Sequence, residues 1–171
     1  MEVKKVNWLG LAGGVTTLAL VVLSLAYASP WWQLTVGQEI GQANVSPLNL
    51  SFDLLGTSMT TPIIWFLNLS CQLSLIACAI AMLVYSIASD KKYSKNLLNF
   101  AYKKPLIIVI VFVVSLFVAT YFAGMLLHIN VPLAGSTTVT LDVGVATMGI
   151  PLATQFTWVF WLAVIATGLC I

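Results

Sequence analysis

The sequence predicts an all-α bundle of four transmembrane helices that carries a small antiparallel β-sheet on its extracellular side. Three observations predict it: the composition, four long apolar segments, and an alternating pattern between those segments. Of 171 residues, 60% are hydrophobic and only 7% are charged, whereas soluble domains carry about 25% charged residues. A soluble fold could not cover its surface with so few charges, so we expect one membrane domain over residues 1–171.

Four apolar segments have the length of a membrane span. The hydrocarbon core of a bilayer is about 30 Å thick and requires roughly 20 apolar residues in a helix. We predict spans at 8–29, 63–88, 106–128 and 151–171, none of which contains Asp, Glu, Lys or Arg. The connections are then an outer loop at 30–62, a cytoplasmic loop at 89–105 and a second outer loop at 129–150.

The helix boundaries carry local signals. Pro62, Pro105 and Pro151 stand at or just before the predicted starts of the second, third and fourth spans, where the missing N–H of proline would be unbonded in any case. Lys4 and Lys5 precede the first span, as basic residues precede a signal peptide. The segment is long for the apolar region of a signal peptide, so we interpret it as an uncleaved span.

The lysines predict the orientation. All seven basic residues are lysines, and they lie before the first span or between the second and third: Lys4, Lys5, Lys91, Lys92, Lys95, Lys103 and Lys104. Because basic flanks are retained in the cytoplasm, we expect a multi-pass protein of the cell membrane with both termini cytoplasmic. Aromatic residues are expected at both interfaces. The outer set is Trp31, Trp32, Trp65, Trp158 and Trp161, and the inner set is Trp8, Tyr85, Tyr93 and Tyr102.

The sequences of the two outer loops predict β-strands. Apolar and polar residues alternate over 32–36, 48–54 and 138–145, which is typical of half-buried strands. Because a lone hairpin is marginally stable in water, we expect both loops to build one antiparallel sheet. Asp53 and Asp142 would lie on its polar face, as solvated or turn-capping carboxylates.

The two halves of the chain resemble each other. The pattern Asp, five residues, Met, two residues, Pro occurs from Asp53 to Pro62 and again from Asp142 to Pro151. This predicts a parallel internal repeat with units at 1–88 and 99–171, related by a pseudo-two-fold axis along the membrane normal.

Small and polar residues within the spans predict helix contacts. Small residues at helical spacing let helices approach closely, and they occur at Gly10, Gly14, Ala119, Ala123 and Gly124.

Asn68 and Gln72 lie one turn apart on the second span. Amides at membrane depth are costly unless they are bonded, so we expect inter-helix hydrogen bonds here. The alternative is a polar lining for a ligand or a partner subunit.

Metal, cofactor and catalytic sites are not expected. His128 is the only histidine, and with Met125 and Met148 it makes at best a weak metal candidate. Cys71, Cys78 and Cys170 lie in apolar runs and are read as buried small side chains. Since no catalytic constellation is recognisable, we expect a protein that is not an enzyme and carries no cofactor.

The first outer loop contains two sequons, at Asn44 and Asn49. Both are candidate N-glycosylation sites in an archaeal or eukaryotic host. The outer loops are rich in uncharged polar residues, which would suit the acidic exterior of an archaeal cell.

The layout resembles the claudin-like tetraspans. In that family four spans carry a longer first outer loop whose strands follow a tryptophan motif, of which Trp31-Trp32-Gln33-Leu34 is a loose echo. The paired cysteines of that loop are absent here. The resemblance implies a four-helix bundle under an extracellular sheet, and no residue role is carried over.

The sequence therefore predicts a non-catalytic structural or accessory subunit of a larger membrane complex, such as a respiratory or transport assembly. The alternative is a self-associating claudin-like structural or adhesion protein, or a small permeation protein. The expected partners are the lipid bilayer and other membrane subunits or further copies of the chain, and no nucleic acid.

Overall fold

The computed structural model describes residues 7–26, 29–37, 41–48, 50–54, 57–59, 62–87, 91–127, 130–142 and 147–170. It contains four helices, α1 (Trp8–Ala26), α2 (Pro62–Ile87), α3 (Ser94–Leu127) and α4 (Trp158–Cys170). The first three are long and apolar enough to cross a membrane, and α4 is a shorter apolar helix. The prediction of four helices is confirmed, and three of them have the length and apolar character expected of the four predicted membrane spans. Their placement in a membrane stays a prediction.

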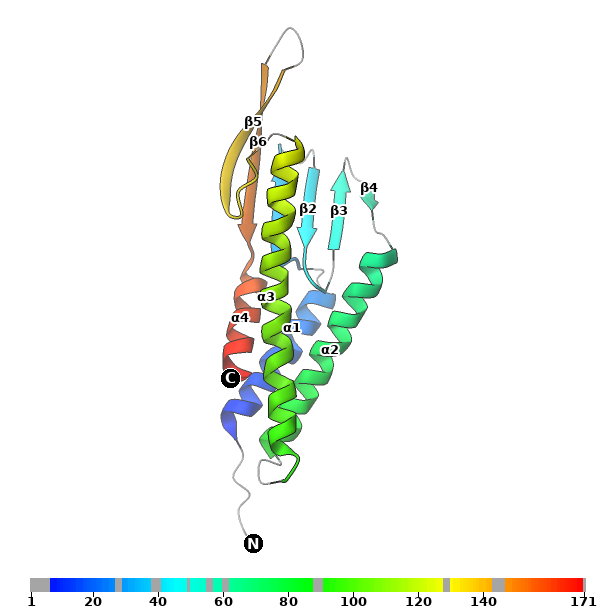
Figure 1. The fold of residues 1–171 in the computed structure, drawn as a ribbon, viewed down its shortest axis with the longest axis vertical. Helices are drawn as coiled ribbons and strands as arrows, with labels where there is room; N and C mark the ends of the chain where they lie inside the picture. Colours follow the sequence, from blue (N-terminus) through cyan, green and yellow to red (C-terminus); the bar gives the residue numbers. More distant parts are fainter. Residues whose placement is uncertain are drawn as a thin grey trace.

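The segments between the helices form a single antiparallel sheet. Its strands are β1 (Trp32–Val36), β2 (Gly41–Val45), β3 (Leu50–Leu54), β4 (Thr57–Met59), β5 (Gly135–Asp142) and β6 (Thr147–Phe156). Their order is β4-β3-β2-β1-β6-β5, so the pairing of β1 with β6 joins the two connecting segments. The sheet lies beyond one end of α1, α2 and α4, whereas the C-terminal part of α3 runs alongside its strands, and the β5–β6 hairpin extends beyond the other strands (Figure 1). The prediction that both segments build one antiparallel sheet is confirmed.

The expected start of the fourth helix is wrong. We predicted a span from residue 151, but β6 runs through Pro151 to Phe156 and α4 begins at Trp158. The reason is the pairing of β6 with β1 on one side and β5 on the other, which satisfies the backbone groups of an apolar stretch outside a helix. Pro151 lies one residue beyond the last β1–β6 pair, Val36 with Leu152, at an end of the ladder where a missing N–H is tolerated. Its carbonyl accepts a hydrogen bond from Gly37 N at 2.7 Å.

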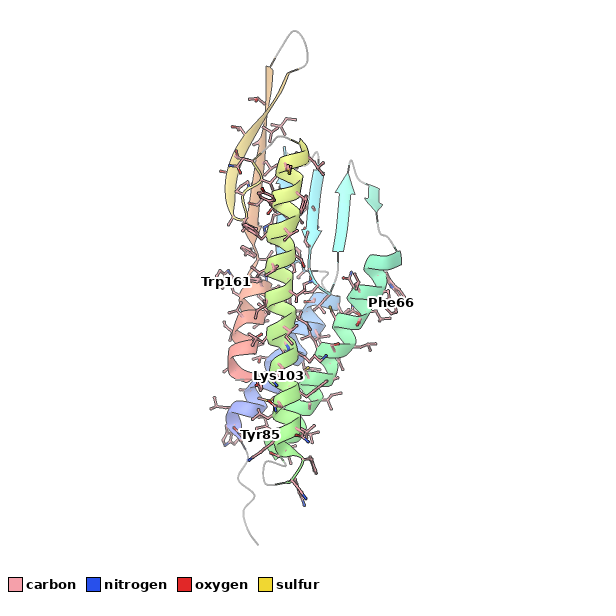
Figure 2. The ribbon with its side chains drawn as sticks, in the orientation of Figure 1. Phe66, Tyr85, Lys103 and Trp161 are labelled. Carbon is pink, nitrogen blue, oxygen red and sulfur yellow. The ribbon has the colours of Figure 1, made fainter. Side chains whose placement is uncertain are left out.

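The prediction of a loop at 89–105 is also largely wrong. Helix α3 begins at Ser94, and Pro105 lies within it. Its 34 residues correspond to about 51 Å at 1.5 Å per residue. The first turns are amphipathic: Ala101 is buried, while Lys103 and Lys104 are exposed. Ala101 packs with Ala81 and Met82 of α2, and this contact stabilises the helix in the lysine-rich segment. Lys103 lies on this part of α3 (Figure 2).

The structure gives the internal repeat no support. Met59 ends β4 and Pro62 begins α2, whereas Met148 and Pro151 both lie inside β6. The matched sequence positions therefore occupy different secondary structure.

Two tryptophans expected at the outer interface are core residues instead. Trp31 and Trp32 are buried, with Trp31 only 1% exposed. Trp31 packs edge-on against Phe112 of α3 and Phe160 of α4, with ring centroids 5.2 and 6.2 Å away. The four other tryptophans are exposed, namely Trp8, Trp65, Trp158 and Trp161. Trp31 thus joins the base of the sheet to two helices.

Glycines bring α1 close to its two neighbours. A Cβ on Gly14 would lie 2.8 Å from Leu83 Cγ of α2, and one on Gly10 would lie 3.3 Å from Tyr85 Cδ1. Gly13, which we had not singled out, faces α4, where a Cβ would lie 3.0 Å from the Leu169 carbonyl oxygen. Both interfaces of α1 therefore depend on the absence of a side chain.

Candidate functional site

The two faces of the sheet differ in polarity. Trp32, Leu34 and Val36 of β1 alternate with Gln33 and Thr35, and residues paired across antiparallel strands share a face. The apolar face is covered by the segment after α3. Trp32 Nε1 donates a hydrogen bond to the Leu133 carbonyl at 2.7 Å, and Thr154 Oγ1 donates to the Pro132 carbonyl at 2.9 Å.

The other face carries a row of side-chain amides. The register places Gln33 of β1 opposite Asn44 of β2 and opposite Gln155 of β6. Gln155 Nε2 donates to Gln33 Oε1 at 3.3 Å, and Gln42 Nε2 donates to Asn44 Oδ1 at 3.3 Å. These four amides, from three neighbouring strands, keep further donors and acceptors for a ligand because each amide has two N–H groups and one carbonyl oxygen.

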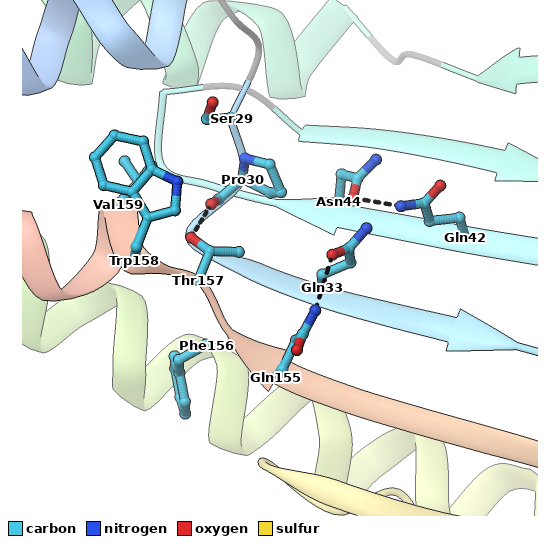
Figure 3. Close-up of a pocket in the computed structure, with 10 residues that line it drawn as sticks. All are labelled: Ser29, Pro30, Gln33, Gln42, Asn44, Gln155, Phe156, Thr157, Trp158 and Val159. Atoms are coloured by element: carbon cyan, nitrogen blue, oxygen red, sulfur yellow. Dashed lines mark hydrogen bonds between the residues drawn. The ribbon is translucent and has the colours of Figure 1, made fainter.

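The amide row opens into a groove of about 530 Å³ at the base of the sheet (Figure 3). Its lower end is formed where the chain enters α4. Thr157 N donates to the Trp31 carbonyl at 3.0 Å, and Thr157 Oγ1 donates to the Pro30 carbonyl. The Trp158 side chain, 61% exposed, lies beside this junction. The groove therefore combines neutral hydrogen-bonding groups with one exposed aromatic ring.

The described residues that line this groove are uncharged. They are Ser29, Pro30, Gln33, Gln42, Asn44, Gln155, Phe156, Thr157, Trp158 and Val159. None of these ten has an ionisable side chain, and the register places Asp53 of β3 opposite Gln42 at the edge of the amide row. The described lining therefore offers no cation to a phosphate or a carboxylate. Its chemistry fits a neutral, hydroxyl-rich or amide-rich group.

The predicted polar pair on α2 lies at a second, smaller cavity. Gln72 Nε2 donates to the Leu48 carbonyl at 2.7 Å, and Leu48 is fully buried between β2 and β3. Asn68 and Gln72 line a cavity of about 130 Å³ together with Ser24 of α1. Ser24 Oγ is buried and has no hydrogen-bond partner among the described residues. The Gln72 amide thus ties the sheet to α2 rather than joining two helices.

A third hollow adjoins the far half of α3. It measures about 700 Å³ and is lined by α3 and the segment that follows it, at Phe117, Thr120, Tyr121, Gly124, Met125, Asn130, Val131 and Leu133. Of the small residues predicted on α3, Ala119 is exposed and Ala123 is partly exposed. Gly124 lines the hollow.

The two aspartates are far apart in the sheet. Asp53 lies in β3 and Asp142 in β5, with β2, β1 and β6 between them. Four strand spacings of about 4.8 Å separate their backbones by at least about 19 Å, because Asp142 also lies further along the sheet, opposite Thr147 of β6. A carboxylate pair is therefore not formed by this register.

The remaining predicted positions are distributed as follows. His128 and Asn49 lie outside the described residues. Met125 is exposed, and the backbone of Met148 lies in β6. No group of three or more His, Cys, Asp or Glu side chains that could hold a metal occurs in the described part of the chain.

Of the two sequon asparagines, Asn44 belongs to the amide row. The third residue of its sequon, Ser46, is buried and accepts a hydrogen bond from Leu48 N at 3.1 Å.

Sequence reasoning missed the amides of the groove. Gln155 lies inside the predicted fourth span, and Gln33 is one of the polar positions in the predicted strand at 32–36, so neither pattern indicates a binding site. The alternation that predicted β1 was a usable signal for Gln33. Only the register of β6 against β1 places Gln155 next to it.

The fold and groove together define a class of protein. It is an apolar helical bundle that bears an antiparallel sheet with one apolar and one polar face, and a groove lined by uncharged polar residues lies where the sheet meets the helices. No protein-family model, curated protein or solved structure matches this chain. These comparisons do not bear on the resemblance to claudin-like tetraspans, which stays a prediction.

Proposed function

We propose that this chain is a non-catalytic subunit of a larger membrane-protein assembly, and that α3 is the helix that receives the partner. The observation that carries this proposal is the exposed apolar face on the far half of α3. Phe117, Tyr121 and Met125 follow one another at helical spacing, and all three side chains are exposed beside the 700 Å³ hollow. Side chains four residues apart share a helix face, so these three form a continuous ridge.

The chemistry of the spans supports a non-catalytic role. Helices α1, α2 and α4 contain no Asp, Glu, Lys or Arg, and the charged residues of α3, Lys95, Lys103 and Lys104, all lie in its lysine-rich first part. Proton relays, pumps and voltage sensors depend on ionisable side chains at membrane depth. A ridge of aromatic and sulfur-containing side chains is instead suited to packing against another apolar helix, because such residues bury large areas and adapt their shape.

The proposed placement is in the cell membrane, with the sheet outside and the lysine-rich segment inside. The distribution of lysines supports it, because all seven lie on the side of the bundle away from the sheet or in the segment that precedes α1.

The orientation can be tested with single introduced cysteines. Ser136→Cys on β5 and Lys95→Cys on α3 are both at exposed positions. In intact cells a membrane-impermeant maleimide should label Ser136→Cys and leave Lys95→Cys unlabelled until the cells are opened. The unsubstituted chain controls for Cys71, Cys78 and Cys170. Labelling of Lys95→Cys in intact cells would contradict the orientation.

The partner can be tested by site-specific photo-crosslinking in the native membrane. With p-benzoylphenylalanine in place of Tyr121, we expect one distinct larger product that contains a second membrane protein, and the same protein should co-purify in mild detergent at fixed stoichiometry. The matched control places the same group at Val22 of α1, which is 54% exposed against 64% for Tyr121. The control should give no protein product.

A second candidate function is self-association through β5. This strand is the outer edge of the sheet, and residues 135–141 contain neither a charge nor a proline. Such edges are templates for strand pairing with another chain. The purification above separates the two candidates, since a homo-oligomer without a second protein would contradict the accessory-subunit proposal and support this one.

A further inference from the structure

We infer that the groove at the base of the sheet binds the neutral sugar headgroup of a membrane glycolipid. The inference rests on the proposed membrane placement but not on the identity of any partner protein. It is carried by the lining of the groove, by its position at the junction of sheet and helices, and by an apolar strip on α4 that continues from it.

The lining selects for a neutral headgroup. Gln33, Asn44 and Gln155 form a row across three strands, and Gln42 lies beside Asn44 on the same face. Amides can donate to and accept from sugar hydroxyls at the same time. A phosphate would be desolvated here without a cationic partner among the lining residues, which is costly for a buried or half-buried charge.

The position of the groove places it at the membrane surface. Its lower wall is the junction at Pro30 and Thr157, where the sheet ends and α4 begins. Trp158 is the first residue of α4 and is exposed at this point. An indole ring at the interface packs against the apolar face of a sugar ring while its N–H remains free to bond.

The apolar strip on α4 would contact the acyl chain of the lipid. Trp158, Trp161 and Ile165 are all exposed, and positions separated by three and four residues share one helix face. The strip descends about 10 Å from the groove, at 1.5 Å per residue. Trp161 projects from the side of α4 in Figure 2. A ligand with a neutral polar head and an acyl chain would contact the groove and the strip together.

The test is native mass spectrometry of the full chain in a polyoxyethylene detergent, because a sugar-headed detergent would compete. The probes are monogalactosyl diacylglycerol and phosphatidylglycerol with the same acyl chains, and soluble methyl β-galactoside. We expect saturable binding of the galactolipid, at least tenfold weaker binding of phosphatidylglycerol, and weaker binding still of the soluble sugar, which lacks the chain. Equal binding of the two lipids would overturn the inference. Equal binding of the soluble sugar and the galactolipid would overturn the role of the α4 strip.

Variants localise the site. Gln33→Ala combined with Gln155→Ala, and separately Trp158→Ala, should each weaken galactolipid binding by at least tenfold. The matched control is Asn99→Ala. It removes an exposed amide near the start of α3, at the end away from the sheet, and should leave binding unchanged. Because all three groove positions are partly or fully exposed, the variants should keep the circular dichroism spectrum of the parent. A groove variant that keeps the spectrum and full galactolipid binding would contradict the site.

A flotation assay separates this inference from the proposed function. A chain that does not float with liposomes contradicts the membrane placement itself. A chain that floats but shows no preference for the galactolipid contradicts only the groove assignment.

Discussion

The Trp31→Ala variant is expected to lose about 3–5 kcal/mol of unfolding free energy, the range for truncating a large aromatic residue in a core. Trp31 is one of the largest fully buried side chains, and it contacts Phe112 and Phe160 through edge-on ring packing. Removal would leave a cavity where the sheet, α3 and α4 meet. We therefore expect the sheet to separate from the helices before the helices themselves unfold.

The measurement is denaturant-induced unfolding in detergent micelles, followed by far-ultraviolet circular dichroism. The matched control is Trp8→Ala, since Trp8 is 73% exposed and its truncation should change stability by less than about 0.5 kcal/mol. Trp31→Phe should fall between the two. It keeps an aromatic ring, and Trp31 Nε1 has no hydrogen-bond partner among the described residues. Similar losses in Trp31→Ala and Trp8→Ala would show that Trp31 is not a core residue.

The Gly14→Ala variant is expected to destabilise the fold by about 1–3 kcal/mol through overpacking. The added Cβ would lie 2.8 Å from Leu83 Cγ and 3.2 Å from the backbone nitrogen of the same residue. The side chain of Leu83 can move, but its backbone cannot yield without separating α1 from α2. Loss of the α1–α2 contact should also loosen α4, because α1 packs against both helices.

The same substitution at Gly168 provides the control for helix propensity. A Cβ at Gly168 meets nothing within 4 Å, and alanine within a helix is favoured over glycine by about 0.5–1 kcal/mol. Gly168→Ala should therefore leave stability unchanged or raise it slightly in the same unfolding assay. If both variants lowered stability equally, the close approach of α1 to α2 at Gly14 would be refuted.

Local patterns in the sequence were sufficient for much of the fold. Hydropathy located α1 and α2 to within a few residues, and Pro62 is the first residue of α2 as its geometry suggested. Period-two alternation located β1, β3 and β5. These features depend on residues close in the chain, so a single sequence carries them.

Features that depend on distant residues were not predictable. Residues 151–156 fall inside the predicted fourth span, and their pairing with β1 and β5 makes them a strand. The lysine-rich start of α3 became helical because Ala101 packs against α2. The two halves share the repeat motif in sequence, but the matched residues lie in different secondary structure.

The candidate site shows the same division. The sequence by itself determined that the chain is apolar, sparsely charged and built around four apolar helices, since composition and hydropathy are sums over residues that are close in the chain. Only the tertiary structure decided that Gln155 lies beside Gln33 and that Trp31 is a core residue rather than an interfacial one. The physical reason is that strand register and helix packing bring together residues more than a hundred positions apart, and no local pattern records those contacts.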